Sequence, residues 1–515
     1  MKLALSRRMA LWIGLVAVLS LGARRAPERI HVILLHTNDL HGQVQPRKAT
    51  WLDREAPPRI GGLPRLAAYT RQVRQAAAEE GSGVLLVDGG DWFQGTPEGL
   101  LEEGRAFAAA LGEVGYDGLT LGNHELDHGL ESLEALLATA GLPAVCANIR
   151  EAEGGARPDW CQPWRVVEVA GLRVALVGLL TPVTPTITHP DASQLDFQEP
   201  AEALAEARAA LAGEVDWVLP LTHLGVRDDR RLAKAHPDLP VIVGGHSHTY
   251  LKEGIRQGET WILQSGSKAS AVGRLDLWFD GETKELVETR YELVDLLEEP
   301  APEHRNARVD ELCADLSRRA EASMSAVVGE LAEPLERHFR LTHSSPSGNL
   351  ITDVMRERLD ADVAVQNRGG IRCDLAGGEV TRRDLFELLP FGNHLVLLEL
   401  DGEELLGLLR ASVEGTAHTG LEVSGLTVRW SQGEGAEGPT LVGLEVGGEP
   451  VVPGKTYRLA TNNFLAGGGD GYALLEGQPV LREDPVLMRE LLEEHFRAAG
   501  TVHPLHEDRY EETQP

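Results

Sequence analysis

The chain has 515 residues, too many for one ordinary hydrophobic core, so we expect two or three domains. Apolar residues make up 42% and charged residues 25%, which excludes a disordered or fibrous protein. The 49 Lys and Arg residues against 79 Asp and Glu residues give a net charge of −30 at pH 7. This charge argues against nucleic acid polymers and anionic membranes as partners, and a small anionic substrate would need a local source of positive charge.

The first residues carry the pattern of an export signal. Lys2, Arg7 and Arg8 precede an apolar run over 9–21, and small residues follow it up to Ala23. The run is shorter than the roughly 20 residues that a membrane-spanning helix needs. We therefore expect residues 1–23 to be a cleaved signal peptide, no stable membrane span afterwards, and a location in the periplasm, the cell envelope or outside the cell. A single membrane anchor is the alternative, and both the Sec and the twin-arginine routes remain open.

Residues 29–297 alternate short apolar runs with stretches of helical spacing, which predicts an α/β domain with a largely buried sheet. From residue 261 to 294 the pattern becomes rich in strands. Strands are predicted at 30–36, 84–87, 174–179, 217–221 and 241–244, and helices at 63–80, 130–140 and 201–212.

A second domain is predicted beyond an acidic segment. Residues 298–325 begin with prolines and continue as a predicted helix, which is typical of an interdomain linker. Residues 326–502 mix helical and strand patterns and predict a second, mixed α/β domain. The acidic residues 503–515 are expected to form a loose tail.

The four cysteines do not define a disulfide framework. Cys146, Cys161, Cys313 and Cys373 lack CxxC spacing and are too few for a fold built on disulfides. Cys146 and Cys161 are close enough in sequence to pair after export, and two buried free thiols are the alternative.

Residue types that bind metals recur where the predicted strands of the first domain end, an edge at which α/β sheets bind ligands. Taken singly, each has an ordinary explanation, such as a turn, a helix cap or a satisfied polar histidine. Their joint occurrence beside glycines at five places favours a metal site. The residues are Asp39 and His41, Asp91, Asn123 and His124, His223, and His246 and His248.

The donor types indicate the chemistry. Imidazoles and carboxylates without thiolates suit Zn²⁺ or Mn²⁺. A carboxylate shared by two ions about 3.5–4 Å apart would make a hydrolytic centre that activates water for an in-line displacement. His124 is placed to meet the leaving group or the developing phosphoryl charge, and Asp127 is placed to orient it.

These motifs resemble a known family. HTNDLHG, GGD, GNHELDHG, LTHLG and GHSHT, in this order, resemble the calcineurin-like metallophosphoesterases, and HTNDLHG with GNHELD is similar to the secreted 5′-nucleotidases. The resemblance implies a four-layer α/β sandwich, two divalent ions (Zn, Mn or Co) bridged by Asp91, and His124 and Asp127 as the catalytic dyad. Some relatives carry a glutamine in place of His248. The remaining ligands implied are Asp39, His41 and His248 for one ion, and Asn123, His223 and His246 for the other.

The second domain has its own polar, glycine-containing loops, NRGGIR, LPFGN and NNFLAGGGDGY. A purely structural explanation is that the glycines form tight turns and the two phenylalanines belong to the core. The functional alternative has Phe391 and Phe464 sandwiching a flat ring, with Asn367 and Asp470 as hydrogen-bonding groups and Arg372 as a phosphate ligand.

The same loops are similar to the 5′-nucleotidase C-terminal domain. The resemblance implies that Phe391 and Phe464 stack on the nucleobase, Asp470 contacts the ribose, and Asn367 and Arg372 face the phosphate. Arg368 stands where the family often has glycine, so it either adds a cation beside the phosphate or points to solvent. Arg337 and Arg340 lie where relatives carry phosphate-binding arginines, in a register that the sequence leaves open.

The predicted function is hydrolysis of nucleoside 5′-monophosphates to nucleoside and phosphate by two-metal-activated hydroxide, with a domain hinge near residues 300–325. The predicted partner is a small nucleotide, and the oligomeric state stays open. Alternatives on the same site are 2′,3′-cyclic nucleotide phosphodiesterase, UDP-sugar hydrolase and nucleoside di- or triphosphate hydrolase. A thiosulfohydrolase-like enzyme is a more distant alternative, because HTNDLHG and the paired Phe391 and Phe464 argue against it. A degenerate nucleotide-binding protein is equally distant, because every ligand and both dyad residues are present.

Overall fold

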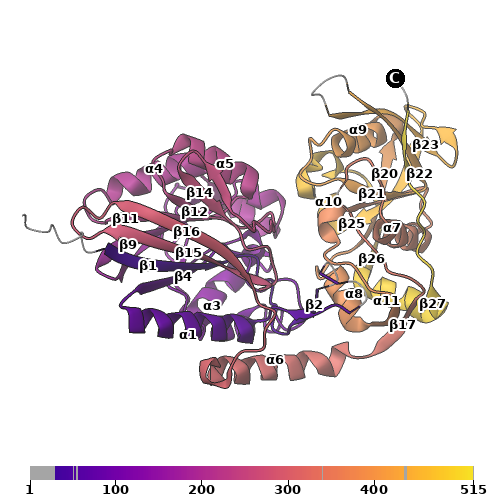
Figure 1. The fold of residues 1–515 in the computed structure, drawn as a ribbon. Coiled ribbons are helices and arrows are strands. Elements are labelled where there is room, and N and C mark those ends of the chain that lie inside the picture. The colour runs from indigo at the N-terminus through magenta and orange to yellow at the C-terminus, as the bar shows by residue number, and fades with distance from the viewer. Residues whose placement is uncertain (1–28, 50–51, 54–55, 339, 434–437, 514–515) are drawn as a thin grey trace, which may run out of the picture.

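The computed structural model describes residues 29–49, 52–53, 56–338, 340–433 and 438–513. The predicted signal peptide lies outside these residues. Two layered domains lie side by side and are joined by the long helix α6 (Ala307–Met324) (Figure 1). No helix in the described ranges is long and apolar enough to cross a bilayer.

Two six-stranded sheets form the centre of the N-terminal domain. The first has the order β16-β15-β1-β4-β5-β6 and the second the order β13-β14-β12-β11-β9-β8. The strands of the first are β1 (Arg29–Thr37), β4 (Gly83–Asp88), β5 (Gly118–Thr120), β6 (Ala144–Val145), β15 (Ala271–Asp280) and β16 (Leu286–Asp295). Those of the second are β8 (Trp164–Val169), β9 (Leu172–Leu180), β11 (Trp217–His223), β12 (Val241–Val243), β13 (Ile255–Gln257) and β14 (Thr260–Leu263).

The two sheets pack face to face and are covered by helices outside, which confirms the predicted four-layer sandwich. Val32 and Leu85 of the first sheet share one buried cluster with Val174 and Leu219 of the second. Helices α1 (Leu63–Glu80), α2 (Arg105–Gly112) and α3 (Leu130–Ala140) cover the first sheet, and α4 (Pro200–Ala210) and α5 (Val226–Ala235) the second. β1, β4, β5 and β6 are parallel neighbours, as are β9, β11, β12 and β14, so their carboxyl ends lie at common edges.

The C-terminal domain is the predicted mixed α/β unit. Its central sheet has the order β21-β18-β25-β20-β26, with one apolar cluster on each face. The central strands are β18 (Val363–Asn367), β20 (His394–Asp401), β21 (Leu421–Ser424), β25 (Thr456–Asn462) and β26 (Val480–Leu487). Helices α7 (Pro346–Leu359), α8 (Arg382–Leu388) and α11 (Met488–Ala499) lie against one face, and α9 (Gly402–Val413) lies against the other.

The loose tail predicted for residues 503–515 is wrong where the structure describes it. β28 (Tyr510–Glu512) pairs in parallel with β22 (Leu426–Gln432). The Asn349 side chain donates to the carbonyls of Leu505 and Glu507, and Tyr510 is 4% exposed. The prediction rested on the acidic composition of the segment. Most of its side chains do face water, but a few buried contacts hold the segment against the domain.

Most of the predicted linker is one helix packed on the N-terminal domain. Val309, Cys313 and Leu316 of α6 are buried in the cluster that also contains α1 and α2. Only two residues separate α6 from β17 (Val327–Leu331), the first strand of the C-terminal domain.

The cysteines are free thiols in the structure. Cys146 and Cys161 are both buried, and the Cys161 thiol donates to the Cys146 carbonyl oxygen at 3.1 Å.

Candidate metal centre and active site

The predicted ligands lie in turns at the strand ends, and five of them adopt backbone conformations that are rare for residues with side chains. The φ angles are 52° at Asp39, 48° at His41, 62° at Asp91, 75° at His246 and 50° at His248. Residues held in this left-handed region cluster at functional sites, where the surrounding structure offsets the strain.

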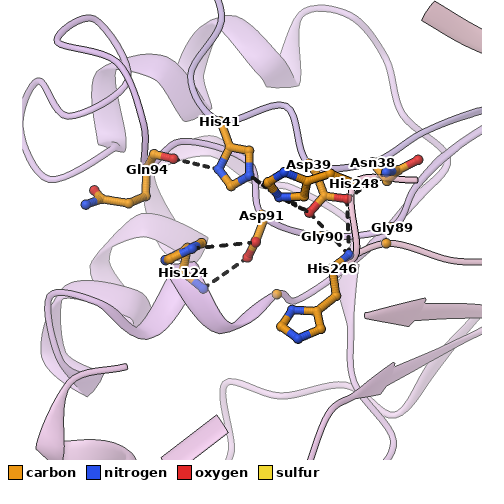
Figure 2. Close-up of polar contacts among 12 residues, drawn as sticks. Asn38, Asp39, His41, Gly89, Gly90, Asp91, Gln94, His124, His246 and His248 are labelled. Atoms are coloured by element: carbon orange, nitrogen blue, oxygen red, sulfur yellow. Dashed lines mark hydrogen bonds and ion pairs between the residues drawn. The ribbon is translucent and has the colours of Figure 1, made fainter. Parts of the chain in front are cut away.

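One group of ligand atoms converges beyond β1. Atoms of Asp39, His41, Asp91 and His248 all lie within 4.8 Å of one another (Figure 2). Nε2 of His248 lies 3.3 Å from Oδ1 of Asp39 and 2.9 Å from Nε2 of His41. Two carboxylates and two imidazoles at these separations suit a divalent ion with mixed N and O ligands.

A second group shares Asp91 with the first. Nε2 of His223 lies 3.2 Å from Oδ2 of Asp91, and Nδ1 of His246 lies 3.1 Å from Oδ1 of Asn123. The His223 and His246 rings meet edge to face, with centroids 5.0 Å apart. Nε2 of His223 is buried and faces the Asp91 carboxylate without a well-aligned hydrogen bond, a position that suits a metal-donor atom.

The outer nitrogens of two histidines are fixed by the backbone. Nδ1 of His41 lies 2.7 Å from the Gln94 carbonyl oxygen, and Nδ1 of His223 lies 2.6 Å from that of Gly89. A proton on Nδ1 leaves the lone pair of Nε2 of each ring, which faces the centre, available to a metal ion. A Cβ at Gly90 would lie 2.7 Å from the His223 ring, so this close approach requires glycine.

Electrostatics favours the protonation states that metal binding needs for three of the histidines. Burial lowers the pKa of His41 and His248, and lowers that of His246 to about 3. Burial acts in the same direction on His223, but the Asp91 carboxylate outweighs it and raises the pKa of His223 to about 10. His223 is therefore the ligand that must lose a proton when a cation binds.

Glu125 is a positioning residue that our sequence reading missed. Its buried carboxylate accepts N–H groups from Asp91 at 3.0 Å, Trp92 at 2.7 Å and Gly122 at 2.7 Å. These bonds tie the loop after β4 to the turn after β5, and so fix the position of the predicted ligand Asp91. The signal was present in GNHE, where a glutamate follows the predicted ligand Asn123 by two residues.

The predicted dyad is formed beside this centre. Nδ1 of His124 lies 2.6 Å from Oδ2 of Asp127, whose other oxygen accepts the Thr188 hydroxyl at 2.9 Å. The His124 backbone N–H donates to Oδ1 of Asp91 at 3.0 Å, and its Nε2 lies 3.9 Å from Oδ2 of Asp91. The free nitrogen of the His124 ring is thus directed to the side of the ligand cluster (Figure 2).

Two predicted residues of the C-terminal domain reach across to this centre. The ring of Phe391 stacks on that of His124, with centroids 5.5 Å apart and planes 24° apart. Nη2 of Arg372 lies 3.5 Å from Nε2 of His41, and its guanidinium carbon lies 5.7 Å from the Phe391 ring centre.

Asn367 and Asp470 form one hydrogen-bonded group. Asn367 Nδ2 donates to Oδ2 of Asp470 at 2.7 Å, and the Asn462 amide donates to Oδ1 of Asn367 at 3.0 Å. Thr419, which our sequence reading did not select, donates to the same Asp470 oxygen at 3.0 Å. The sequence offers no local signal for Thr419, because it lies 51 residues from its partner.

A single cavity of about 2380 Å³ lies between the domains and brings these groups together. Asp39 and His223 lie beneath its surface and are fully buried. The other predicted site residues line it: His41, Asp91, Asn123, His124, Asp127, His246, His248, Asn367, Arg372, Phe391, Phe464 and Asp470.

Neither interpretation of Arg368 is correct. Its side chain is 2% exposed and donates to the carbonyls of Arg340, His343 and Leu421, with Glu422 at 3.5 Å. It therefore supports the fold and points neither to phosphate nor to solvent. Arg337 lines the cavity and donates to the Ile371 carbonyl at 2.7 Å.

The layered fold and the acid–imidazole centre define a metal-dependent phosphoesterase. Residues 33–250 match the family model of the calcineurin-like phosphoesterases, and residues 327–477 match that of the 5′-nucleotidase C-terminal domain. Together with the relatives below, these matches show that the chain belongs to the 5′-nucleotidase family of metallophosphoesterases, which are hydrolases of nucleotides.

The relatives match along almost the whole chain. Protein UshA of Escherichia coli is 28% identical over 522 residues, which is 92% of each chain. A 5′-nucleotidase of Vibrio cholerae is 26% identical over 532 residues, covering 93% of this chain and 92% of that protein. The crystal structure of a 5′-nucleotidase precursor from Thermus thermophilus matches with a TM-score of 0.83 and 30% identity, covering 94% of this chain and all of that one.

A sulfate thiohydrolase, SoxB of Thermus thermophilus, shares the fold. It matches with a TM-score of 0.80 over 93% of this chain and 96% of its own. At 21% identity this likeness concerns the fold alone.

Proposed function

We propose that the protein hydrolyses nucleoside 5′-monophosphates to nucleoside and inorganic phosphate at a two-metal centre. The observation that carries the proposal is the meeting, across one cavity, of the ligand cluster and dyad with Phe391 and Arg372. Asp91 would be shared by both ions. Asp39, His41 and His248 would complete one site, and Asn123, His223 and His246 the other.

The donor set fits divalent cations, because its imidazoles and carboxylates converge and Nε2 of His223 is directed at the Asp91 carboxylate. Bound there, two such ions would activate a water molecule and neutralise charge on the phosphoryl oxygens. Zn²⁺, Mn²⁺ and Co²⁺ are the candidates.

The protein's own groups handle the leaving group. As water adds to phosphorus and releases a proton to the solvent, the bond from phosphorus to the 5′ oxygen breaks, and that oxygen must gain a proton to leave as a hydroxyl. His124 supplies it from Nε2, because Nδ1 is held by Asp127 at 2.6 Å. Thr188 holds the second oxygen of Asp127 and so fixes the orientation of the pair.

The C-terminal domain holds the nucleotide in this scheme. Phe391 and Phe464 stack on the base, since both line the cavity. Asp470 and Asn367 hydrogen-bond the ribose and its neighbouring groups. Arg372 pairs with phosphate, because its guanidinium lies beside His41 at the ligand cluster.

We also propose that the chain is exported and that its domains move relative to each other during turnover. Helix α6 packs on the N-terminal domain, so the movement would centre on the two residues between α6 and β17. N-terminal sequencing of protein from the cell envelope tests cleavage near Ala23. A disulfide engineered across the cavity should stop turnover and restore it on reduction; full activity of the oxidised form would refute the movement.

The substrate assignment is tested with enzyme purified without metal. Mn²⁺, Zn²⁺ or Co²⁺ is added, and phosphate release is measured from AMP, UMP, 2′,3′-cyclic AMP, ATP and a UDP-sugar. We expect AMP and UMP to be hydrolysed fastest. If both are inert with every metal while another substrate turns over, the assignment fails. An Asp91→Ala variant that keeps full activity would exclude the two-metal centre.

A further inference from the structure

Both domains contribute cationic side chains to the lining of the cavity, beside carboxylates, although the chain as a whole is strongly acidic. Arg47 and Lys268 belong to the N-terminal domain, and Arg337 and Arg372 to the C-terminal domain. Burial lowers the pKa of Lys268, and the charge of Arg372 acts in the same direction. Arg372 in turn lies 3.5 Å from the predicted ligand His41. The cationic part of the wall therefore adjoins the metal centre.

Lys268 is fixed to the segment that carries the ligand Asp39. Its backbone N–H donates to the Asp39 carbonyl at 2.7 Å, and its φ is 57°. Asn38, one residue before that ligand, donates to the Gly266 carbonyl and accepts both the N–H and the hydroxyl of Ser265. The loop after β14 thus places the lysine in a defined position relative to the centre.

The charge of Lys268 has no full partner within the protein. The side chain is only 7% exposed, and it forms no ion pair with any residue that the structure describes. Two groups of the C-terminal domain, Cys373 and Glu387, partly oppose the lowering of the Lys268 pKa by burial. Burial raises the pKa of Cys373 to about 12, so this thiol is neutral, and burial raises that of Glu387 as well. A buried ammonium so placed is stabilised by an anion that enters the cavity.

We infer that Lys268 binds the phosphate group at the metal centre, acting from the N-terminal domain as Arg372 does from the C-terminal domain. This deepens the proposed function and rests on it for the identity of the nucleotide. Lysine recognises phosphoryl oxygens as a compact charge and does not read the nucleoside. Because its loop is tied to Asp39, Lys268 stays with the centre in any movement of the C-terminal domain.

The position of Lys268 predicts different effects on two binding affinities, that for phosphate and that for adenosine. Loss of the Lys268 charge should weaken binding of phosphate, both as the free product and as part of the nucleotide. Binding of adenosine should be unaffected, since its base and ribose are held by Phe391, Phe464 and Asp470. A lysine that only balanced charge in the wall would produce no such selectivity.

The test compares Lys268→Met, Lys268→Arg and Lys252→Met in the Mn²⁺-loaded enzyme. Lys252 is exposed and serves as the matched control. Binding of inorganic phosphate is measured by calorimetry, inhibition by adenosine and KM for AMP by assay, and metal content by elemental analysis. For Lys268→Met we expect phosphate affinity to fall and KM for AMP to rise about tenfold or more, with adenosine inhibition and metal content unchanged. Lys268→Arg should restore most of the phosphate affinity, and Lys252→Met should behave as the parent.

Unchanged phosphate affinity in a folded, metal-loaded Lys268→Met protein would overturn the inference. So would an equal loss of phosphate and adenosine binding. If Lys268→Met does not fold, Lys268→Gln takes its place, and the same outcomes decide. If the parent enzyme does not hydrolyse AMP, the proposed function fails, while the phosphate calorimetry still tests Lys268.

Discussion

Asp127→Asn is the most direct test of the proposed catalytic pair. Oδ2 of Asp127 lies 2.6 Å from Nδ1 of His124, and Oδ1 accepts the Thr188 hydroxyl. Asparagine has the same shape, so both neighbours keep a group within reach. The substitution removes the negative charge that stabilises a protonated His124, and it permits the amide to present its NH₂ group to the ring.

The expected loss in kcat follows from the strength of the hydrogen bond between His124 and Asp127, which the substitution weakens. A hydrogen bond to a charged group contributes about 1.5–3 kcal/mol, which corresponds to a loss of about 10- to 150-fold in kcat. His124→Ala removes the proposed general acid itself and should cost about 10²- to 10⁴-fold. The loss in Asp127→Asn should therefore be the smaller of the two.

The assay uses two leaving groups. Ribose 5′ oxygen needs a proton to leave, whereas 4-nitrophenolate leaves as an anion, so Asp127→Asn should slow AMP hydrolysis more than 4-nitrophenyl phosphate hydrolysis. Thr188→Val, which loses one neutral hydrogen bond to Asp127, serves as the control and should cost less than about tenfold. Full activity of Asp127→Asn on AMP, or an equal loss on both substrates, would refute the assignment of His124 as the acid.

Three other buried side chains give further expectations. Glu125→Gln weakens the three N–H contacts that hold the Asp91 loop, so Mn²⁺ affinity should fall about 10- to 100-fold. Arg368→Met leaves Glu422 buried without its cation and should lower the unfolding free energy by about 3–5 kcal/mol, with KM for AMP unchanged. Burial raises the pKa of Asp229 from 3.8 to about 7, so the folded state holds this proton longer and loses stability as pH rises from about 4 to 7. Asp229→Asn should remove up to about 4 kcal/mol of that loss.

Each expectation has its own readout. Metal titration of Glu125→Gln with affinity equal to the parent would show that this carboxylate does not position Asp91. Urea unfolding measures Arg368→Met; weaker AMP binding at unchanged stability would place Arg368 at the phosphate after all. For Asp229, unfolding of the metal-free protein is compared at about pH 4 and about pH 8. A stability difference between variant and parent that is the same at both pH values contradicts the assigned pKa.

The parts of the molecule that could be predicted from the sequence are those encoded locally. Helices α1 and α3 begin and end where expected, because each finishes at a glycine in left-handed conformation, Gly81 and Gly141. The ligand motifs were also recognisable because they are encoded locally. Each is a short turn between a buried strand and a glycine. The parallel order of the strands then brings motifs that are far apart in sequence to common edges.

What could not be predicted depends on partners distant in the chain. Arg368 stands inside a phosphate-type motif, yet its side chain turns to carbonyls 25 to 53 residues away. A sequence motif predicts the conformation of the backbone turn. It does not predict where a long side chain binds, because that depends on which other loops offer carbonyl oxygens that lack a hydrogen-bond donor.

The acidic net charge of the chain does not describe the surroundings of its metal centre. A net charge of −30 describes the whole molecule, but the cavity holds Arg47, Lys268, Arg337 and Arg372 beside a centre whose predicted ligands include only two carboxylates. Negative side chains at the surface face water and are screened over about 10 Å at ordinary salt. Buried cations are screened much less. A small phosphate ester that reaches the metal centre therefore meets the guanidinium of Arg372, while a long polyanion, whose length stays outside, meets the acidic surface.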